Sequence, residues 1–492
     1  MNRKILIIGI SVHLLAAIFS IGFNNHDEHF QILEFAALKL NLAGANDMPW
    51  EFNYHMRPTV QPAIAYFIIN TSKLIGLVNP FSQATVLRII SSLLALLCMY
   101  VLIKSLGGEI RSGFLNQWFV FLSLLLWFMP YLHARFSSEN WAGLAFWIGL
   151  ALLNFPKTEG VGKNNGHMKE LLIGVLFGFS VTLKFQVGFM IAGLILWLVF
   201  IQKVKYSSLI MLILGALIPI LVEILVDRWF YGDWAIAPWN YFKVNIIEGK
   251  ISEFGINPWW YYFKEIFFKA IPPFSIFIII NTIFFWVYYP KHIVTWVTVP
   301  FILVHSLIGH KDIRFLFPPV NILPFVLIAS FQVIREDPRF LRVKEVFKVS
   351  KRYIVWTFVP VNSILLLIVC FRPADAVTSL YQYIYDHYDA KNIVLAYDKE
   401  NPFYRGNANV HFYKPRELSI MKIENPEEFH EYVLNSSKKI LYATQEFELD
   451  TKKWDIQCSR VYRFLPSVVK YFNFNNWLKR TKHWTLYECA AR

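Results

Sequence analysis

The sequence predicts an all-α polytopic membrane protein with a smaller polar domain at its C-terminal end. Two observations predict this fold class. First, 56% of the 492 residues are hydrophobic and 17% are charged, whereas soluble globular proteins carry about 25% charged residues. Second, apolar runs long enough to cross a bilayer follow one another as far as residue 371, where the chain becomes polar.

The apolar runs predict the number of helices. A helix that spans the hydrocarbon core needs roughly 20 residues, with a range of about 17–25. Several runs lie near the lower limit, so we expect about 11–13 transmembrane helices. The runs cover residues 5–23, 60–78, 83–103, 115–132, 141–155, 171–183, 186–201, 207–226, 267–288, 293–308, 317–334 and 353–371.

Charged loops predict the orientation. Loop 335–352 contains seven basic and three acidic residues, and loop 157–169 carries three lysines. Cytoplasmic loops are enriched in Lys and Arg, so both loops are expected in the cytoplasm. The first apolar run has basic residues before it and no small-residue cleavage site after it, which predicts a retained span with a cytoplasmic N-terminus. The long polar loops 24–59 and 227–266 then lie on the exoplasmic side, with everything after residue 371.

The net charge of +14 comes from 48 Lys and Arg against 34 Asp and Glu. Because the basic residues gather in short loops between apolar runs, we expect contact with membrane lipid and no nucleic-acid partner. The four cysteines show no spacing typical of a metal site, so neither a metal nor a cofactor is expected. Cys98 and Cys370 lie in apolar runs, whereas Cys458 and Cys489 can pair if their polar region faces an oxidising compartment.

Residues 372–492 are expected to form a separate exoplasmic domain, after a transmembrane domain of residues 1–371. Two short apolar runs in the polar region, 392–397 and 439–443, are typical of buried strands. They predict a small α/β or mixed domain.

The first polar loop contains the clearest candidate for catalysis. Asp27 and Glu28 are adjacent carboxylates between His26 and His29, directly after the first apolar run. A partly buried carboxylate at this place can act as a general base, and the alternative is a solvated loop with ordinary charges. Farther along the loop, Arg57 can bind a phosphate through two parallel hydrogen bonds or extend to lipid headgroups.

Two further charged residues interrupt the apolar runs. Arg135 and Glu139 lie between runs 115–132 and 141–155. Ionisable residues at membrane depth are costly and are usually functional or paired. The alternative to a functional role is an ion pair between the two, four residues apart on one helix.

The later loops suggest a binding site for a sugar, a lipid and an anion. Loop 227–266 is rich in aromatic residues and also contains Asn and Pro, a combination that suits sugars and polyprenyl chains, although an interfacial aromatic belt is the alternative. Its candidates are Asn240, Trp259, Trp260 and Tyr262. A second set of candidates lies in the loop between the run that ends at residue 308 and the run that begins at residue 317. These basic residues can bind an anion or anionic lipid: His310, Lys311 and Arg314.

Taken in order, these motifs resemble glycosyltransferase family 22. That family contains the dolichol-phosphate-mannose-dependent mannosyltransferases of N-glycan and GPI-anchor assembly and their bacterial relatives. Its first-loop motif is similar to residues 26–31, and its later signatures are similar to residues 227–241, 254–262 and 310–315. Two positions differ: Asp312 stands where Glu is usual, and Tyr241 stands where Phe is usual.

The resemblance implies a GT-C fold with its active site on the exoplasmic face. It implies inverting, metal-independent transfer of mannose from a polyprenyl-phosphate-mannose donor to a glycan or glycolipid acceptor. Asp27 would be the base and Glu28 would orient or tune it. The donor phosphate would be bound by Arg57, His310, Lys311 and Arg314. The sugar or lipid groove would be lined by Trp259, Trp260, Tyr262 and Asn240. Arg135 and Glu139 would support the site.

Two alternative functions share parts of this pattern. A GT-C transferase that uses another lipid-linked sugar would contain the same motifs. A transporter or flippase of lipid-linked saccharides would share the spans and the phosphate site, but transporters are often built from internal repeats, which this sequence does not show. The modest length favours a bacterial inner membrane, with the endoplasmic reticulum membrane as the alternative.

Overall fold

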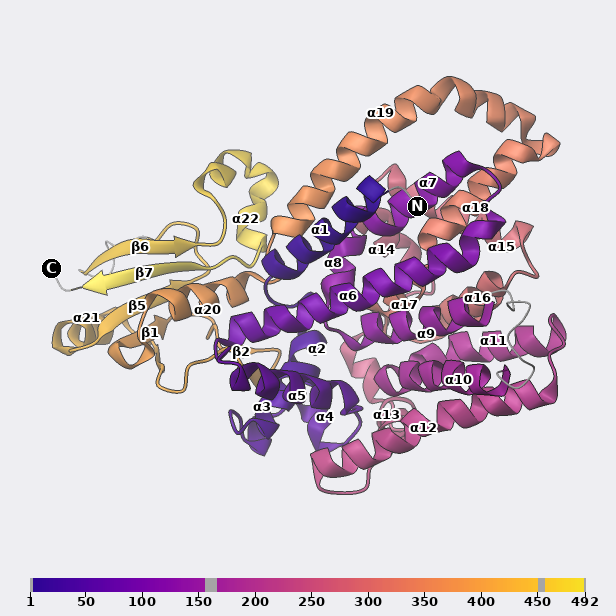
Figure 1. Cartoon of the computed structure of the whole chain (residues 1–492). Coiled ribbons are helices and arrows are strands. Elements are labelled where there is room, and N and C mark those ends of the chain that lie inside the picture. The colour runs from indigo at the N-terminus through magenta and orange to yellow at the C-terminus, as the bar shows by residue number, and fades with distance from the viewer. Residues whose placement is uncertain (1–2, 155–165, 450–455, 491–492) are drawn as a thin grey trace. The chain divides into compact units, whose positions relative to one another are not determined.

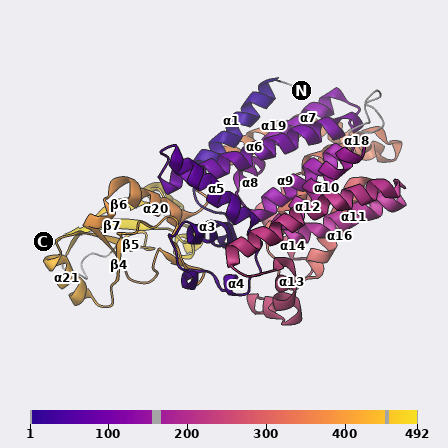
Figure 2. The same ribbon diagram turned by 60° about the horizontal axis from the view of Figure 1, so that its bottom comes forward.

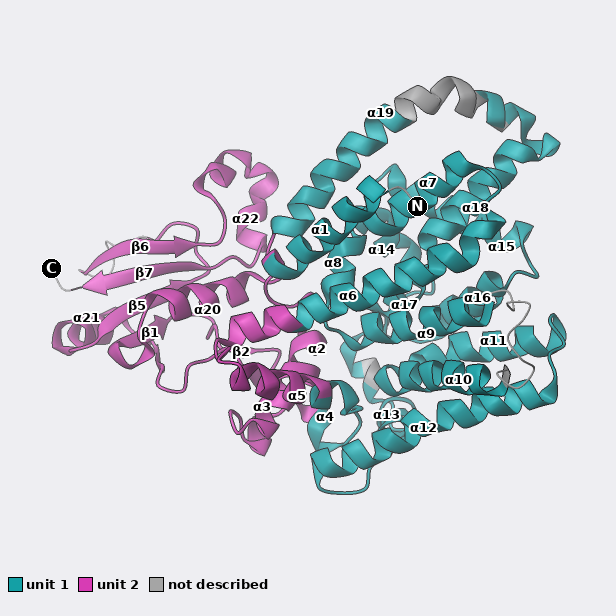
Figure 3. Ribbon diagram, viewed as in Figure 1, with its two compact units in different colours: residues 1–18, 51–63, 87–371 teal, residues 19–50, 64–86, 372–492 magenta. Residues whose placement is uncertain are grey.

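The computed structural model describes residues 3–154, 166–449 and 456–490. The chain forms two compact units, coloured teal and magenta in Figure 3, and each contains segments that are distant in the sequence. The first unit consists of residues 1–18, 51–63 and 87–371. The second consists of residues 19–50, 64–86 and 372–492. One of the junctions between the units therefore lies between Phe371 and Arg372.

The first unit is helical throughout its described part (Figure 1). In chain order its helices, two of which begin in residues of the second unit, are α1 (Arg3–Phe19), α4 (Trp50–Asn53), α6 (Pro80–Leu106), α7 (Gly113–Leu125), α8 (Met129–Ala134), α9 (Ser138–Asn154), α10 (Gly166–Leu183), α11 (Gly188–Phe200), α12 (Tyr206–Tyr231), α13 (Ala237–Phe242), α14 (Tyr261–Lys269), α15 (Phe274–Tyr288), α16 (Ile293–Leu307), α17 (Phe317–Val320), α18 (Leu323–Glu336) and α19 (Leu341–Phe371).

Helices α10 and α12 pack closely because small residues line their contact, and Figures 1 and 2 both show them side by side. A Cβ atom at Gly174 would lie 2.2 Å from the carbonyl oxygen of Leu212, and one at Gly178 would lie 2.2 Å from that of Ala216. No side chain fits at such distances. The Gly174-x-x-x-Gly178 spacing thus allows two backbones to approach closely, as small residues do between membrane helices.

In the part of the chain that the structure describes, two helices are long and apolar enough to cross a membrane: the span that contains α6, Pro80–Glu109, and α12. Two bent pairs raise the number to four if each pair is one span, and several other apolar helices have 10–17 residues. The expected all-α membrane architecture is confirmed, whereas the number of crossings stays a prediction. Fewer helices than expected are long enough because two of the expected apolar runs are each divided between two helices. Run 115–132 covers α7 and α8, and run 267–288 is interrupted between α14 and α15 at Pro272–Pro273.

The second unit contains the small mixed α/β domain that the sequence predicts. Its main sheet has the strand order β4-β1-β5-β7-β6, with β1 parallel to β4 and β5 and with β7 antiparallel to β5 and β6. The strands are β1 (Ile393–Tyr397), β4 (Ser419–Lys422), β5 (Lys439–Thr444), β6 (Gln457–Arg463) and β7 (Thr485–Ala490), and a separate hairpin joins β2 (Tyr404–Arg405) to β3 (Ala408–Asn409). The two predicted apolar runs became β1 and β5.

Helices and N-terminal segments complete the second unit (Figure 1). Its helices are α2 (His26–Glu28), the π-helix η1 (His29–Leu33), α3 (Glu34–Lys39), α20 (Ala376–His387), α21 (Pro426–Asn435) and α22 (Trp477–Arg480), and it takes most of α5 (Val60–Leu74). The N-terminal and C-terminal segments are hydrogen-bonded to each other, since the N–H of Ala374 donates to the carbonyl oxygen of Ile21 at 2.7 Å.

Cys458 and Cys489 form a disulfide between neighbouring strands β6 and β7. Their Cα atoms are 4.1 Å apart, and the two residues are direct partners in the strand register. Cys98 and Cys370 are buried free thiols. The conditional pairing that the sequence suggests is therefore present. Part of the predicted cytoplasmic loop 157–169 lies outside the described residues.

Candidate functional site

The predicted site residues divide between the two units. Asp27 and Glu28 belong to the second unit, and all the other candidates belong to the first.

The carboxylates of the first loop lie on the short helix α2. Asn25 caps this helix, because its side-chain oxygen accepts a hydrogen bond from the N–H of Asp27 at 3.1 Å. The N–H of Asn24 donates to Glu28 Oε2 at 2.8 Å, and Glu28 is buried while Asp27 is half-buried. Helix α2 continues into the π-helix η1, and such segments frequently occur at functional sites.

Glu34 anchors this segment to the C-terminal part of the chain, a role that the sequence analysis did not predict. Its buried carboxylate accepts hydrogen bonds from the backbone N–H groups of His411 and Phe412 at 3.0 and 3.1 Å. His29 Nε2 lies 2.7 Å from Glu34 Oε1, and the His29 ring stacks on Tyr413 with centroids 5.4 Å apart. Residues about 380 positions apart in the sequence thus hold the loop that carries Asp27.

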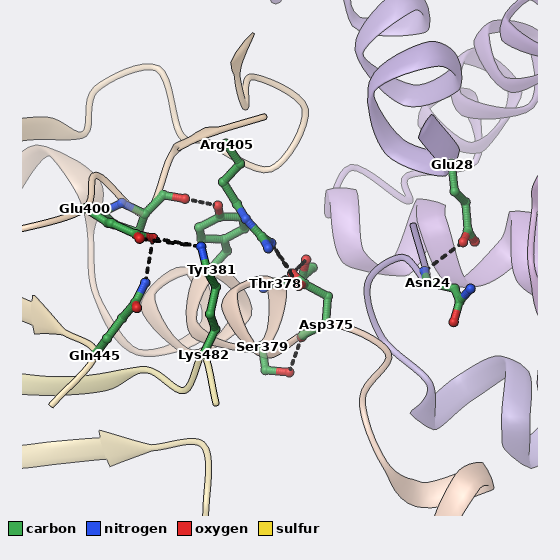
Figure 4. A network of polar contacts seen from close by, with 11 residues as sticks. Asn24, Glu28, Asp375, Thr378, Ser379, Tyr381, Glu400, Arg405, Gln445 and Lys482 are labelled. Carbon is green, nitrogen blue, oxygen red and sulfur yellow. Dashed lines mark hydrogen bonds and ion pairs between the residues drawn. The ribbon is translucent and has the colours of Figure 1, made fainter. Parts of the chain in front are cut away.

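An ion pair next to this loop fixes the β2–β3 hairpin. Figure 4 shows the Arg405 guanidinium directed at Asp375, with Nη1 at 2.8 and 2.9 Å from the two carboxylate oxygens. Asp375 also caps α20 by accepting hydrogen bonds from Thr378. Arg405 lies 5.4 Å from the centroid of the Phe23 ring. Partial burial and the charge of Arg405 lower the pKa of His26, the residue before Asp27.

In the first unit, Arg57 is held among aromatic rings. Its guanidinium forms an ion pair with Glu51 and lies 5.2 Å from the centroid of the Tyr241 ring. The hydroxyl of Tyr231 donates to the carbonyl oxygen of Arg57 at 2.7 Å. Glu51, Tyr231 and Tyr241 therefore fix both the backbone and the side chain of Arg57.

The C-terminal end of α12 makes further contacts with the loop that carries Arg57. Asp227 Oδ1 accepts hydrogen bonds from the N–H and the hydroxyl of Thr59, at 2.9 and 2.6 Å, directly before α5 begins. Asn240 Nδ2 donates to the carbonyl oxygen of His55 at 3.1 Å. This contact gives Asn240 a place beside the Arg57 loop, and its expected role in a sugar or lipid groove stays a prediction.

Glu139 lies in the centre of a buried charge cluster. Its Oε1 accepts a hydrogen bond from Lys184 Nζ at 2.7 Å and lies 3.9 Å from Arg314 Nη1. Arg314 Nε in turn lies 3.2 Å from Asp312 Oδ2. Arg57 and Arg314 are both close enough to act electrostatically on the Lys184 ammonium. In the sequence, Lys184 directly follows the short apolar run 171–183, and nothing in that pattern indicates its partner.

The helical ion pair between Arg135 and Glu139 that the sequence allowed does not match the local structure. Helix α8 ends at Ala134 and α9 begins at Ser138, so residues 135 and 139 are not four apart on one helix. The Arg135 guanidinium lies 4.7 Å from the centroid of the Tyr131 ring, whereas Glu139 pairs with Lys184. The interruption at residues 135–137 explains the difference.

Lys311 and His310 occupy a loop that is tied to loop 227–266. Lys311 Nζ donates to the carbonyl oxygens of Asn257 and Ile308 at 2.7 and 2.6 Å, and that of Gly309 lies at 3.5 Å. Burial lowers the pKa of Lys311. Because backbone carbonyls take its N–H groups, Lys311 connects two loops, and a phosphate would have to compete with them. His310 packs edge-on against Phe254 and Phe315.

The three aromatic candidates differ in exposure. Trp259 and Trp260 are 65% and 46% exposed, whereas Tyr262 is 2% exposed. Burial and the charge of Asp312 raise the pKa of Tyr262. The two tryptophans can contact lipid or substrate in this structure, and Tyr262 is part of the packed interior.

Among residues 3–154, 166–449 and 456–490, no group of three or more His, Cys, Asp or Glu side chains is arranged to hold a metal ion. The charged clusters of the first unit instead combine guanidinium, ammonium and carboxylate groups. Such clusters can bind an anion and stabilise charge that develops on it.

Comparison with known proteins identifies relatives of the whole helical part. Residues 4–411 match the model of the Alg9-like mannosyltransferase family. The mannosyltransferase APTG1 of Arabidopsis thaliana is 26% identical over 336 residues, which is 67% of this chain and 58% of that protein. The human GPI alpha-1,2-mannosyltransferase 3 is 24% identical over 310 residues, 61% of this chain and 52% of that protein. The chain thus spans little more than half the length of these relatives.

A solved structure has the same fold. ArnT from Cupriavidus metallidurans, in a crystal structure with bound undecaprenyl phosphate, aligns with a TM-score of 0.50 at 10% identity over 99% of this chain and 98% of that one. At this identity the likeness concerns the fold alone. It confirms the GT-C fold with a strand-containing C-terminal domain.

Proposed function

The chain belongs to the Alg9-like mannosyltransferase family, and from this membership we propose that it transfers mannose from a polyprenyl-phosphate-mannose donor to a glycan or glycolipid acceptor. The observation that carries the proposal is that two guanidinium groups, those of the half-buried Arg57 and the buried Arg314, each lie beside an aromatic ring and a carboxylate. A planar guanidinium matches the oxygens of a phosphate and keeps its charge at all physiological pH values.

The proposed reaction inverts the configuration at the sugar carbon. Asp27 takes the proton of the acceptor hydroxyl, and the hydroxyl oxygen attacks C1 of the mannose. The bond between C1 and the phosphate oxygen breaks, and the electron pair leaves with the polyprenyl phosphate. Arg57 and Arg314 stabilise the negative charge that develops on the phosphate, so the step is proposed to need no metal ion. Glu28 orients or tunes Asp27. His310 and Lys311 also contribute to binding of the donor phosphate.

An exoplasmic active site is part of the proposal. The disulfide between Cys458 and Cys489 in the second unit supports it, because disulfides persist in oxidising compartments such as the periplasm and the lumen of the endoplasmic reticulum. Asp27 belongs to that same unit. A bacterial inner membrane remains our preferred location.

A donor panel tests the proposed activity. Membranes that contain the protein, and matched membranes without it, receive radiolabelled polyprenyl-phosphate-mannose or polyprenyl-phosphate-glucose, with and without EDTA. We expect protein-dependent transfer of mannose that EDTA does not reduce. Transfer from the glucosyl donor alone would show that the donor carries a sugar other than mannose. Transfer from neither donor by folded protein would contradict the proposal.

A further inference from the structure

Three charged side chains from distant segments meet inside the first unit. Glu139 lies in the first turn of α9, Lys184 lies between α10 and the short helix η5 (Phe185–Val187), and Arg314 lies in the 3-10 helix η8 (Ile313–Leu316). Their exposed fractions are 3%, 6% and 9%. Burying charge among apolar helices is costly unless the charges are paired or used, so this cluster needs a physical reason.

The cluster has more than one cation for its central carboxylate. Glu139 Oε1 is 2.7 Å from Lys184 Nζ and 3.9 Å from Arg314 Nη1, so one oxygen atom faces two positive groups. The charge of Arg57 also acts on the Lys184 ammonium. A phosphate, with several acceptor oxygens, could interact with more of these cations than one carboxylate oxygen does.

The ammonium of Lys184 retains donors for such a ligand. An ammonium has three N–H donors, and within the described part of the chain the hydrogen-bond acceptor of Lys184 is Glu139. Lys311 differs, because its Nζ donates to the carbonyl oxygens of Asn257 and Ile308. Compared with Lys311, Lys184 has N–H groups left for an added anion.

The backbone at Lys184 also suits a binding residue. Its φ and ψ angles of −152° and 99° are extended, so the chain leaves the helical path between Leu183 and Phe185. Such breaks within membrane-spanning helices are tolerated where they are buried in protein or line a cavity. Because of this break, the Lys184 side chain reaches the cluster. A continuous helix would orient this side chain differently.

We propose that Lys184 is a ligand of the donor phosphate, and that Glu139 holds its ammonium in place until the phosphate binds. This inference rests on the proposed function and adds a residue to its phosphate site. Lys184 forms no covalent bond in the reaction. It stabilises the negative charge on the phosphate as the sugar leaves, together with Arg314.

A purely structural role for the pair predicts a different behaviour. If Lys184 only ties α10 to α9 through Glu139, then its removal lowers stability and leaves the phosphate affinity of the folded protein unchanged. Removal of Glu139 separates the two roles further. A phosphate ligand competes with Glu139 for Lys184, so Glu139→Gln would tighten phosphate binding, whereas a structural tie gives no reason for tighter binding.

The test measures binding of undecaprenyl phosphate to the purified full chain in detergent, beside its thermal unfolding midpoint. We expect Lys184→Gln to weaken binding by about 10- to 100-fold, the loss typical of one charge-assisted hydrogen bond. Lys184→Arg keeps most of the affinity, and Glu139→Gln binds more tightly than the wild type. Exposed Lys205 provides the matched control, and Lys205→Gln binds like the wild type.

The double variant Glu139→Gln, Lys184→Gln controls for misfolding. It removes both charges together, so neither position keeps a buried charge that has lost its partner. It should fold and still bind weakly. Wild-type affinity in folded Lys184→Gln or in the double variant would overturn the inference while leaving the proposed function intact. Failure of the wild type itself to bind undecaprenyl phosphate would overturn the proposed donor class, and the inference with it.

Discussion

Asp227 Oδ1 accepts two hydrogen bonds from Thr59, one from the backbone N–H at 2.9 Å and one from the hydroxyl at 2.6 Å. The two residues are 168 positions apart in the sequence. Through this contact α12 caps the start of α5 and fixes the loop that carries Arg57. The Asp227-to-Tyr241 motif, which the sequence suggests only by resemblance, therefore has a physical role: it positions a predicted phosphate ligand.

The first prediction concerns this cap. Asp227→Ala removes the acceptor and should lower the free energy of unfolding by about 0.5–2 kcal/mol, as loss of a helix cap does, and it should raise KM for the lipid donor because the Arg57 loop is released. Asp227→Asn keeps a side-chain oxygen and should stay close to the wild type. Thermal unfolding and donor kinetics measure both effects.

The exposed carboxylate of Asp233, which lies 3.9 Å from Arg228, gives the control for this experiment. Asp233→Ala should change neither quantity, because exposed ion pairs contribute little. A folded Asp227→Ala variant with the KM of the wild type would show that the cap does not position the loop.

The second prediction concerns the stability of the buried pair of Glu139 and Lys184. Glu139→Ala leaves the ammonium without its carboxylate and should lower the free energy of unfolding by about 3–5 kcal/mol. The double variant Glu139→Leu, Lys184→Met replaces both charges by apolar groups and should recover most of that loss. Thermal unfolding in detergent measures the difference, and a double variant as unstable as the single one would argue against the pair as described.

The third prediction concerns the β2–β3 hairpin of the second unit. Arg405→Gln breaks the ion pair with Asp375 beside the Phe23 ring, so hydrogen exchange should become faster at residues 20–34 and sugar transfer should fall. The control is Lys399→Gln, which removes an exposed ion pair with Glu446 and should change neither. Unchanged exchange at residues 20–34 in Arg405→Gln would refute the positioning role of the hairpin.

The fourth prediction concerns the cysteines. When membranes are denatured without a reductant and treated with maleimide-polyethylene glycol, Cys98 and Cys370 should react, and Cys458 and Cys489 should react only after reduction. The variant Cys458→Ser should show one more reactive thiol before reduction, because Cys489 loses its partner. Labelling of all four thiols before reduction would contradict the disulfide and weaken the case for an exoplasmic domain.

Much of the fold follows from local patterns in the sequence. Apolar runs near 20 residues predicted the long helices α6 and α12, and short apolar runs in a polar region predicted β1 and β5. These predictions succeed because the length and spacing of apolar residues determine burial locally. The break at Pro272–Pro273 has a signal in the sequence, because proline ends or kinks a helix, and treating run 267–288 as one span passed over that signal.

The site was predicted less completely, for a different reason. Asp27, Arg57 and Arg314 were named because charged residues near apolar runs are conspicuous. The contacts that anchor the site were not predicted, because the pairs Glu34 with His411 and Glu139 with Lys184 join residues 377 and 45 positions apart. Only the tertiary fold brings such residues together, so no spacing in the sequence could indicate them.

The central claim, that Asp27 is the base of a lipid-linked mannosyl transfer, is tested most directly by one assay. Membranes that contain equal amounts of folded wild type or Asp27→Asn receive radiolabelled polyprenyl-phosphate-mannose, and transfer to acceptor is measured. Asparagine keeps the shape of the side chain and cannot accept the proton. We predict that transfer by the wild type falls at least about 100-fold in Asp27→Asn, the contribution of a general base. Transfer at the wild-type rate by Asp27→Asn would contradict the account.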